Sequence, residues 1–187
     1  MTLAVRLGGA GGQGIVLAGL ILAEAAALAG RRVVCTQAYG PESRGGASRS
    51  DVIISDQPIV FPMARRLDVL VALTQEACDR SWGALAPNGL AIIDAGRVTL
   101  PPRGPAECHA LPVTGTARLV TGSTRSANIV ALGAVCGLTG VVPRPALEEA
   151  VARRVPSASR GLNLAALGAG ERLGVEARAA VAAGGGR

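Results

Sequence analysis

The chain alternates short apolar runs with longer segments of helical composition, and this alternation predicts an α/β domain. Six runs have the length and composition of strands, at residues 3–7, 32–37, 51–55, 68–73, 90–94 and 108–112. Helices are expected at 15–29, 75–85, 114–121 and 126–139, from Pro145 at a first helical turn, and at 159–173. Strands that are apolar on both faces and alternate with helices form mostly parallel sheets between helical layers. We therefore expect a three-layer, Rossmann-like domain with a mostly parallel sheet and a helical C-terminal part.

The length of 187 residues fits one domain with its own core, which we place at 1–181. Residues 182–187 read Ala-Ala-Gly-Gly-Gly-Arg and offer little to pack, so a disordered tail is predicted there.

A glycine-rich junction, Gly9-Ala10-Gly11-Gly12-Gln13-Gly14, separates the first predicted strand from the first helix. Unpaired N–H groups and the positive end of the helix dipole suit such a junction to a phosphate or carboxylate. The alternative is that the glycines only let the helix and strand pack closely. The spacing also fits G-x-G-x-x-G, but a dinucleotide fold needs an acidic residue at the end of the second strand. That strand ends in Thr36-Gln37, and Glu24 lies inside the first helix, so NAD is disfavoured.

A second loop, from Ala38 to Ser48, follows the second strand at the edge where open α/β sheets bind ligands. Tyr39, Glu42 and Arg44 supply a ring, a carboxylate and a guanidinium there. Arg44 is suited to a phosphate or carboxylate. The alternative is an internal Glu42–Arg44 ion pair that stiffens a surface loop.

Composition narrows the possible partners. Hydrophobic residues make up 49% of the chain but aromatic residues only 2%, so the core must consist of Ala, Val, Leu and Ile. The net charge of +6 comes from scattered arginines, and single Trp, Tyr and Phe residues provide no base-stacking platform, so we expect no nucleic-acid partner. The longest uncharged stretch, Ser126–Pro143, contains Asn128 and falls short of a membrane span, which favours a buried helix.

The chemistry-bearing residues do not form a catalytic set. Cys35, Cys78, Cys108 and Cys136 lie far apart without a CxxC pair, and His109 is the only histidine. We therefore expect no metal ligands, no catalytic residues in this chain, and free thiols in a reducing, cytoplasmic setting.

Three segments together resemble one family. Residues 9–19, residues 39–46 and the Asn128-centred segment 126–134 are similar to the gamma subunit, or fused gamma domain, of 2-oxoacid:ferredoxin oxidoreductases. The Tyr-Gly-Pro-Glu form of the second loop resembles the 2-oxoglutarate, branched-chain and pyruvate types. Ile129 stands where Met is commoner in the family.

This resemblance implies one part of a larger enzyme that oxidatively decarboxylates a 2-oxoacid, with 2-oxoglutarate favoured, to an acyl-coenzyme A. It implies that the chain is inactive alone, helps bind coenzyme A and holds alpha and beta, and possibly delta, subunits together. Thiamine diphosphate and iron–sulfur clusters would belong to those partner subunits, which pass electrons to ferredoxin.

The cofactor-binding residues that the resemblance implies are Gly9, Gly11, Gly12, Gln13, Gly14, Tyr39, Glu42, Arg44, Gly45, Gly46 and Asn128. Ala- and Gly-rich helices near 15–29 and 126–139 further predict a homo-oligomer of the isolated chain. The alternative is a free-standing Rossmann-like module that binds a nucleotide or another cofactor.

Overall fold

The computed structural model describes residues 2–39, 46–104 and 106–184. Its strands are β1 (Thr2–Ala10), β2 (Arg32–Tyr39), β3 (Ala47–Ser55), β4 (Leu67–Ala72), β5 (Leu85–Asp94) and β6 (Glu107–Leu111). Its α-helices are α1 (Ile15–Leu28), α2 (Gln75–Trp82), α3 (Val113–Thr121), α4 (Ala127–Thr139), α5 (Arg144–Arg154) and α6 (Arg160–Gly184). Two short 3₁₀ turns, η1 (Thr124–Ser126) and η2 (Ser157–Ser159), precede α4 and α6.

The six strands form one sheet in the order β2-β3-β1-β4-β5-β6. β1, β4, β5 and β6 pair in parallel, whereas β3 runs antiparallel to both of its neighbours, β1 and β2. The mostly parallel sheet is thus confirmed, with one reversed strand that the apolar pattern could not reveal. A strand buried on both faces has the same apolar pattern whether it runs parallel or antiparallel to its neighbours. Only the short connection between β2 and β3 indicates a hairpin, because a parallel crossover needs a longer connection.

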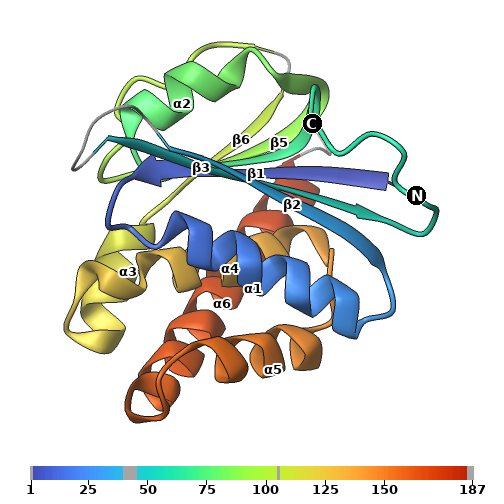
Figure 1. The fold of residues 1–187 in the computed structure, drawn as a ribbon. Helices are drawn as coiled ribbons and strands as arrows, with labels where there is room; N and C mark the ends of the chain where they lie inside the picture. Colours follow the sequence, from blue (N-terminus) through green and yellow to red (C-terminus); the bar gives the residue numbers. More distant parts are fainter. Residues whose placement is uncertain (1, 40–45, 105, 185–187) are drawn as a thin grey trace.

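Helices cover both faces of the sheet, as predicted (Figure 1). α2 lies on one face, while α1, α3, α4, α5 and α6 lie on the other. On the larger side, α1 packs on β3 and β2, α5 packs on α1, and α6 packs on α4. The buried members of the main core cluster are all Ala, Val, Leu or Ile, as the composition predicts.

Close approach of α4 and α6 depends on four glycines, Gly133 and Gly137 on α4 and Gly170 and Gly174 on α6. A Cβ added at any of them would overlap backbone atoms of the opposite helix. The two helix backbones therefore touch directly, as small residues at every fourth position allow.

Several element boundaries differ from the prediction. β1 and β3 are longer than expected because Gly8–Ala10 pair with Ala47–Arg49. The predicted turn at Pro87–Gly89 lies within β5, where the register against β4 shifts between Leu67 and Val69, so the turn residues form a bulge.

The helix α6 corrects the prediction for the C-terminus. It continues past Leu173 to Gly184, so residues 182–184, predicted as disordered, are helical. Alanine has the highest helix propensity, so the alanine-rich run extends α6 beyond the predicted end. Residues 185–187 lie outside the described residues. No described helix has the length and apolar character needed to cross a membrane.

Candidate functional site

The glycine junction forms a tight loop between β1 and α1. Gly12 (φ 87°) and Gly14 (φ 70°) both adopt left-handed backbone conformations that side chains with a Cβ rarely take. The Gln13 side-chain oxygen accepts a hydrogen bond from the Ala10 N–H at 2.6 Å. Gly14 is the N-cap of α1, and its carbonyl accepts the first helical bond from the Ala18 N–H at 2.9 Å. The loop is therefore fixed by its own hydrogen bonds.

Two glycines of this segment, Gly9 and Gly12, have different surroundings. A Cβ on Gly9, inside β1, would lie 2.5 Å from Gln13 Oε1 and 2.8 Å from Ile15 Cδ1, so Gly9 serves packing. A Cβ on Gly12 would meet no atom within 4 Å. Gly12 is exposed, and its open side faces the solvent where a ligand could approach the backbone. Packing therefore explains the glycine at position 9, whereas at position 12 the space beside the backbone is open.

The start of α1 offers backbone donors. No described residue accepts a hydrogen bond from the N–H groups of Ile15, Val16 and Leu17. The N-cap residue is a glycine and makes no side-chain cap bond. These groups lie at the positive end of the helix dipole, which favours a bound anion.

The structure brings the two predicted loops together. The Gly11 N–H donates to the Gly46 carbonyl at 2.7 Å, which joins the glycine loop to the end of the second loop. Tyr39, the last residue of β2, pairs through its backbone with Ser48 of β3, so the second loop closes a hairpin at this edge. The predicted residues Glu42, Arg44 and Gly45 lie outside the described residues.

A hydrogen bond from the Asn128 side chain connects α4 to the glycine loop. This side chain is buried, with 4% of its surface exposed. Its Nδ2 donates to the Gly14 carbonyl at 3.0 Å, and its Oδ1 accepts from the Ile129 N–H at 2.9 Å. A Cβ on Gly14 would lie 2.5 Å from Asn128 Nδ2, so only a glycine at this position leaves room for the Asn128 side chain. Asn128 therefore positions the loop through a contact made 114 residues away in sequence.

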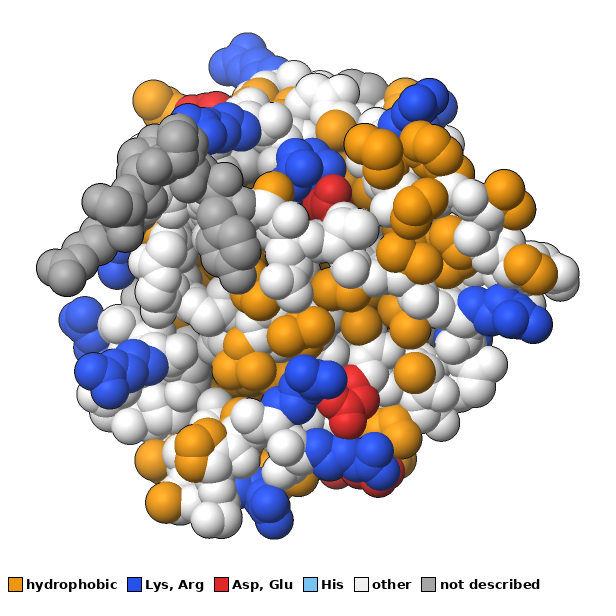
Figure 2. Space-filling model, in the orientation of Figure 1, with side chains coloured by type: hydrophobic (Ala, Val, Ile, Leu, Met, Phe, Trp, Pro, Cys, Tyr) orange, Lys and Arg blue, Asp and Glu red, His pale blue; other side chains and the backbone are white. Residues whose placement is uncertain are grey.

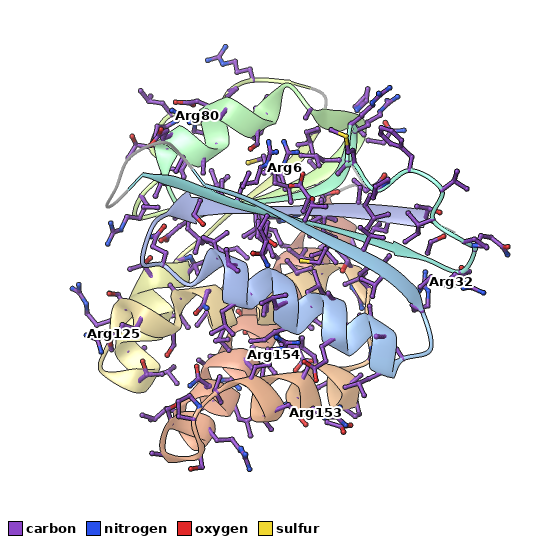
Figure 3. The ribbon with its side chains drawn as sticks, viewed as in Figure 1. Arg6, Arg32, Arg80, Arg125, Arg153 and Arg154 are labelled. Carbon is purple, nitrogen blue, oxygen red and sulfur yellow. The ribbon has the colours of Figure 1, made fainter. Side chains whose placement is uncertain are left out.

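A cleft of about 490 Å³ opens between the glycine loop and the helical C-terminal part. We call it the glycine-loop cleft; it is lined by Gly12, Gly14, Leu17, Thr121, Ser123, Arg125, Ser126, Asn128, Ile129, Val155, Pro156, Ser159, Leu162 and Asn163. None of these described lining residues is acidic. Arg125, at the turn before α4, has its exposed side chain on the α3 side of the molecule (Figure 3). A cleft of this size, lined by apolar side chains and several polar groups, is typical of small-molecule sites.

Sequence reasoning missed most of this lining. Arg125, Ser126, Ser159 and Asn163 come from η1, η2 and α6, whose approach to the glycine loop depends on helix packing rather than on local pattern. The only signal available was the placement of hydroxyl residues ahead of helix starts, and those also serve as caps: Ser123 accepts from the Arg125 N–H at 3.2 Å.

Comparisons with known proteins point to one family. Residues 4–173 match the family model described as pyruvate ferredoxin/flavodoxin oxidoreductase. The 2-oxoglutarate synthase subunit KorC of Methanocaldococcus jannaschii is 41% identical, over 92% of this chain and 94% of its own length. A keto/oxoacid ferredoxin oxidoreductase gamma subunit from Geobacter sulfurreducens is similar in structure, with TM-score 0.87, 45% identity, and coverage of 95% of this chain and 98% of that one.

A longer protein also contains the same fold. The 2-oxoglutarate:ferredoxin oxidoreductase of Magnetococcus marinus, solved with 2-oxoglutarate, coenzyme A and succinyl-CoA bound, matches 94% of this chain but only 31% of its own chain. The TM-score is 0.85 at 26% identity.

Proposed function

Since the chain belongs to the pyruvate ferredoxin/flavodoxin oxidoreductase family, we propose that it is the gamma-type subunit of a 2-oxoacid:ferredoxin oxidoreductase and that its glycine-loop cleft binds coenzyme A. The favoured 2-oxoacid is 2-oxoglutarate, because a relative of nearly the same length is named a 2-oxoglutarate synthase subunit. Thiamine diphosphate, the iron–sulfur clusters and the contact with ferredoxin are assigned to alpha and beta, and possibly delta, subunits.

One observation carries the coenzyme A proposal: the unpaired N–H groups at the start of α1 open onto a cleft that has no acidic side chain among its described lining residues. Coenzyme A is an anionic nucleotide whose diphosphate suits a helix N-terminus, and Arg125 adds a positive charge. NAD is a poor fit because β3 lies between β1 and β2, so the strand that carries the ribose-binding acid in a dinucleotide fold is not adjacent to β1. The coenzyme A bound in the Magnetococcus protein supports the same ligand class.

A substitution at Gly12 tests the ligand. Gly12→Val places a branched side chain at the open edge of the glycine-loop cleft, where it blocks approach to the backbone. In the enzyme purified with its partner subunits, we expect the KM for coenzyme A to rise at least tenfold and the KM for 2-oxoglutarate to stay unchanged. Direct titration with coenzyme A in a calorimeter should show the same loss of affinity.

Gly30→Val is the matched control. Gly30 also has a left-handed backbone (φ 76°) with open space around its Cβ, but it lies beyond the opposite end of α1. Both variants carry the same kind of backbone strain, so general destabilisation affects them equally. Unchanged coenzyme A binding in Gly12→Val would show that the glycine loop is a structural connector.

The connection between β3 and β4 supports a role in assembly. It exposes Val60 (94%), Phe61 (48%) and Met63 (61%), and with β1 and β3 it borders a groove of about 510 Å³. Hydrophobic side chains gather on the corresponding upper right of the space-filling view (Figure 2). Isolated exposed residues are ordinary, but a contiguous apolar patch is typical of a protein interface.

We take the occupant of this patch to be another subunit of the same oxidoreductase. In the Magnetococcus protein the matching region is less than a third of one polypeptide, so other parts of that enzyme accompany the fold. In the isolated chain, the same patch would favour a homo-oligomer.

Co-purification tests the assembly proposal. Val60→Glu should prevent tagged alpha and beta subunits from retaining this chain, because burying a carboxylate at an apolar contact costs free energy. Leu119→Glu, at an equally exposed position on α3 (87%), should leave retention intact. Normal retention of both variants would place the interface elsewhere, and failure of the unmodified chain to associate would favour the free-standing module.

A further inference from the structure

A second, smaller pocket lies beside the glycine-loop cleft at the same edge of the sheet. Its volume is about 200 Å³, and it is lined by Ala10, Gly12, Gln13, Thr74, Arg97, Thr114, Thr124 and Arg125. We call it the arginine pocket. It shares Gly12 and Arg125 with the glycine-loop cleft, so the two spaces meet at the glycine loop. A volume of this size suits one chemical group of a ligand rather than a whole cofactor.

The arginine pocket occupies the point where the sheet changes its direction of winding. From β1 the chain crosses through α1 on one face, whereas from β4 it crosses through α2 on the other (Figure 1). Ala10 ends β1, and Thr74 is the N-cap of α2 directly after β4. Open α/β sheets bind ligands in the crevice at such a switch point.

Several donors around this pocket are free to bind a ligand. The Gln13 amide uses its oxygen for the Ala10 N–H, which leaves its NH₂ group without a partner among the described residues. The Thr74 oxygen accepts from the Ala77 N–H at 3.2 Å, so its hydroxyl hydrogen is available. Neither Arg97 nor Arg125 has an ion-pair partner among the described residues.

The Asp94 backbone holds the turn that carries Arg97, and the buried Asp94 carboxylate does not compete for the Arg97 guanidinium. The Asp94 carbonyl accepts from the N–H groups of Arg97 (2.9 Å) and Val98 (2.8 Å), which forms the turn that carries Arg97. The fully buried Asp94 carboxylate accepts from the Thr114 hydroxyl and from the Thr114 and Gly96 N–H groups, both at 3.3 Å. Its charge is therefore satisfied by neutral donors, and the Arg97 guanidinium stays available.

We propose that the arginine pocket binds the 3′-phosphate of coenzyme A, with Arg97 and Arg125 as the residues that recognise it. This inference rests on the proposed coenzyme A function and adds a specificity site to it. A phosphate monoester carries a charge of about −1.5 to −2 at neutral pH, which matches two guanidinium groups. The diphosphate, whose phosphates each carry a single charge and continue the ligand in both directions, fits the open start of α1 instead.

The test compares coenzyme A with 3′-dephospho-coenzyme A in calorimetric titrations of the enzyme purified with its partner subunits. The unmodified enzyme should bind coenzyme A roughly ten- to a hundredfold more tightly, the range expected for charge-assisted hydrogen bonds. Arg97→Gln should remove most of this preference by weakening coenzyme A binding alone. Arg97→Lys should restore part of it, because a charge returns without the planar fork.

Arg103→Gln serves as the matched control. Arg103 is also exposed and lies in the connection between β5 and β6 but lines neither the cleft nor the arginine pocket, so it removes the same charge elsewhere. Equal affinity of the unmodified enzyme for the two ligands would overturn the 3′-phosphate site and leave coenzyme A binding intact. Equal weakening of both ligands by Arg97→Gln would likewise overturn it. Absence of binding by either ligand would overturn the coenzyme A function itself.

Discussion

Replacing Gly170 by alanine should show how strongly this domain depends on direct backbone contact between α4 and α6. A Cβ at Gly170 would lie within 3.0 Å of three backbone atoms of Val130, and backbone atoms cannot rotate away. The helices must separate or slide. Such overpacking costs about 1–3 kcal/mol, whereas the better helix propensity of alanine returns up to about 1 kcal/mol. We expect the free energy of unfolding to fall by about 1–2 kcal/mol.

Gly168→Ala isolates the propensity effect in the same helix. Its Cβ would meet only the ends of the Arg144 and Arg172 side chains, at 3.5 and 3.9 Å, which are ordinary contacts. This variant should be as stable as the parent or more stable, by up to about 1 kcal/mol.

Urea unfolding followed by circular dichroism measures the free energy of unfolding of both variants. In thermal unfolding, the melting temperature of Gly170→Ala should fall by roughly 2–8 °C for a domain of this size. If both alanines change stability in the same direction, the contact between the two helix backbones does not limit packing, and the reasoning fails.

Three further variants probe buried charge, protonation and surface pairing. Asp51→Asn should lower the free energy of unfolding by about 3 kcal/mol, because Asp51 holds the buried Arg6 guanidinium through two 2.7 Å bonds; denaturant titration measures the loss, and a change below 1 kcal/mol would contradict it. Burial raises the pKa of Cys78 from 9.0 to about 11, so the unfolded thiol ionises first and stability should decline between pH 9 and 11. Unfolding free energies measured across that range should decline less steeply in Cys78→Ala, and an identical slope would argue against the shifted pKa. Glu24→Gln should cost less than about 1 kcal/mol, because the two α5 arginines that pair with Glu24 are partly exposed; a melting curve that shows a larger loss would contradict this.

The sequence predicts the elements of this fold better than their assembly. Six strands and six helices appear near their predicted positions because period and composition are local properties. The antiparallel direction of β3 was not predictable in that way, since a strand such as Val52–Ile54, buried on both faces, has no polar side to show its orientation. The length of α6 was underestimated because a glycine- and alanine-rich terminus suggested disorder, although alanine is the best helix former.

The candidate site was likewise predictable only in its local parts. The glycine loop and Asn128 could be found from sequence, because the loop joins a strand to a helix and the Asn128-centred segment carries a family resemblance. Arg97 and Arg125 could not, because each is one of many scattered arginines and becomes distinctive only where α3, η1 and the end of β5 meet the glycine loop. Convergence of this kind is set by helix packing, on which local pattern carries little information.

Pairing of β3 on both sides limits where evolution can add or remove residues in this chain. Ser48 pairs with Gly9 on one side and with Tyr39 on the other, so the second loop is anchored to the glycine loop through a fixed ladder. Deleting one residue from β3 would turn every following side chain to the opposite face of the sheet, and deleting two would draw the loop back by one pleat. The described residues of the connections at 56–66 and 95–106 belong to no such ladder. Length variation among homologous chains should therefore collect in these two connections, and residues 47–55 should keep a constant length wherever both loops serve the same ligand.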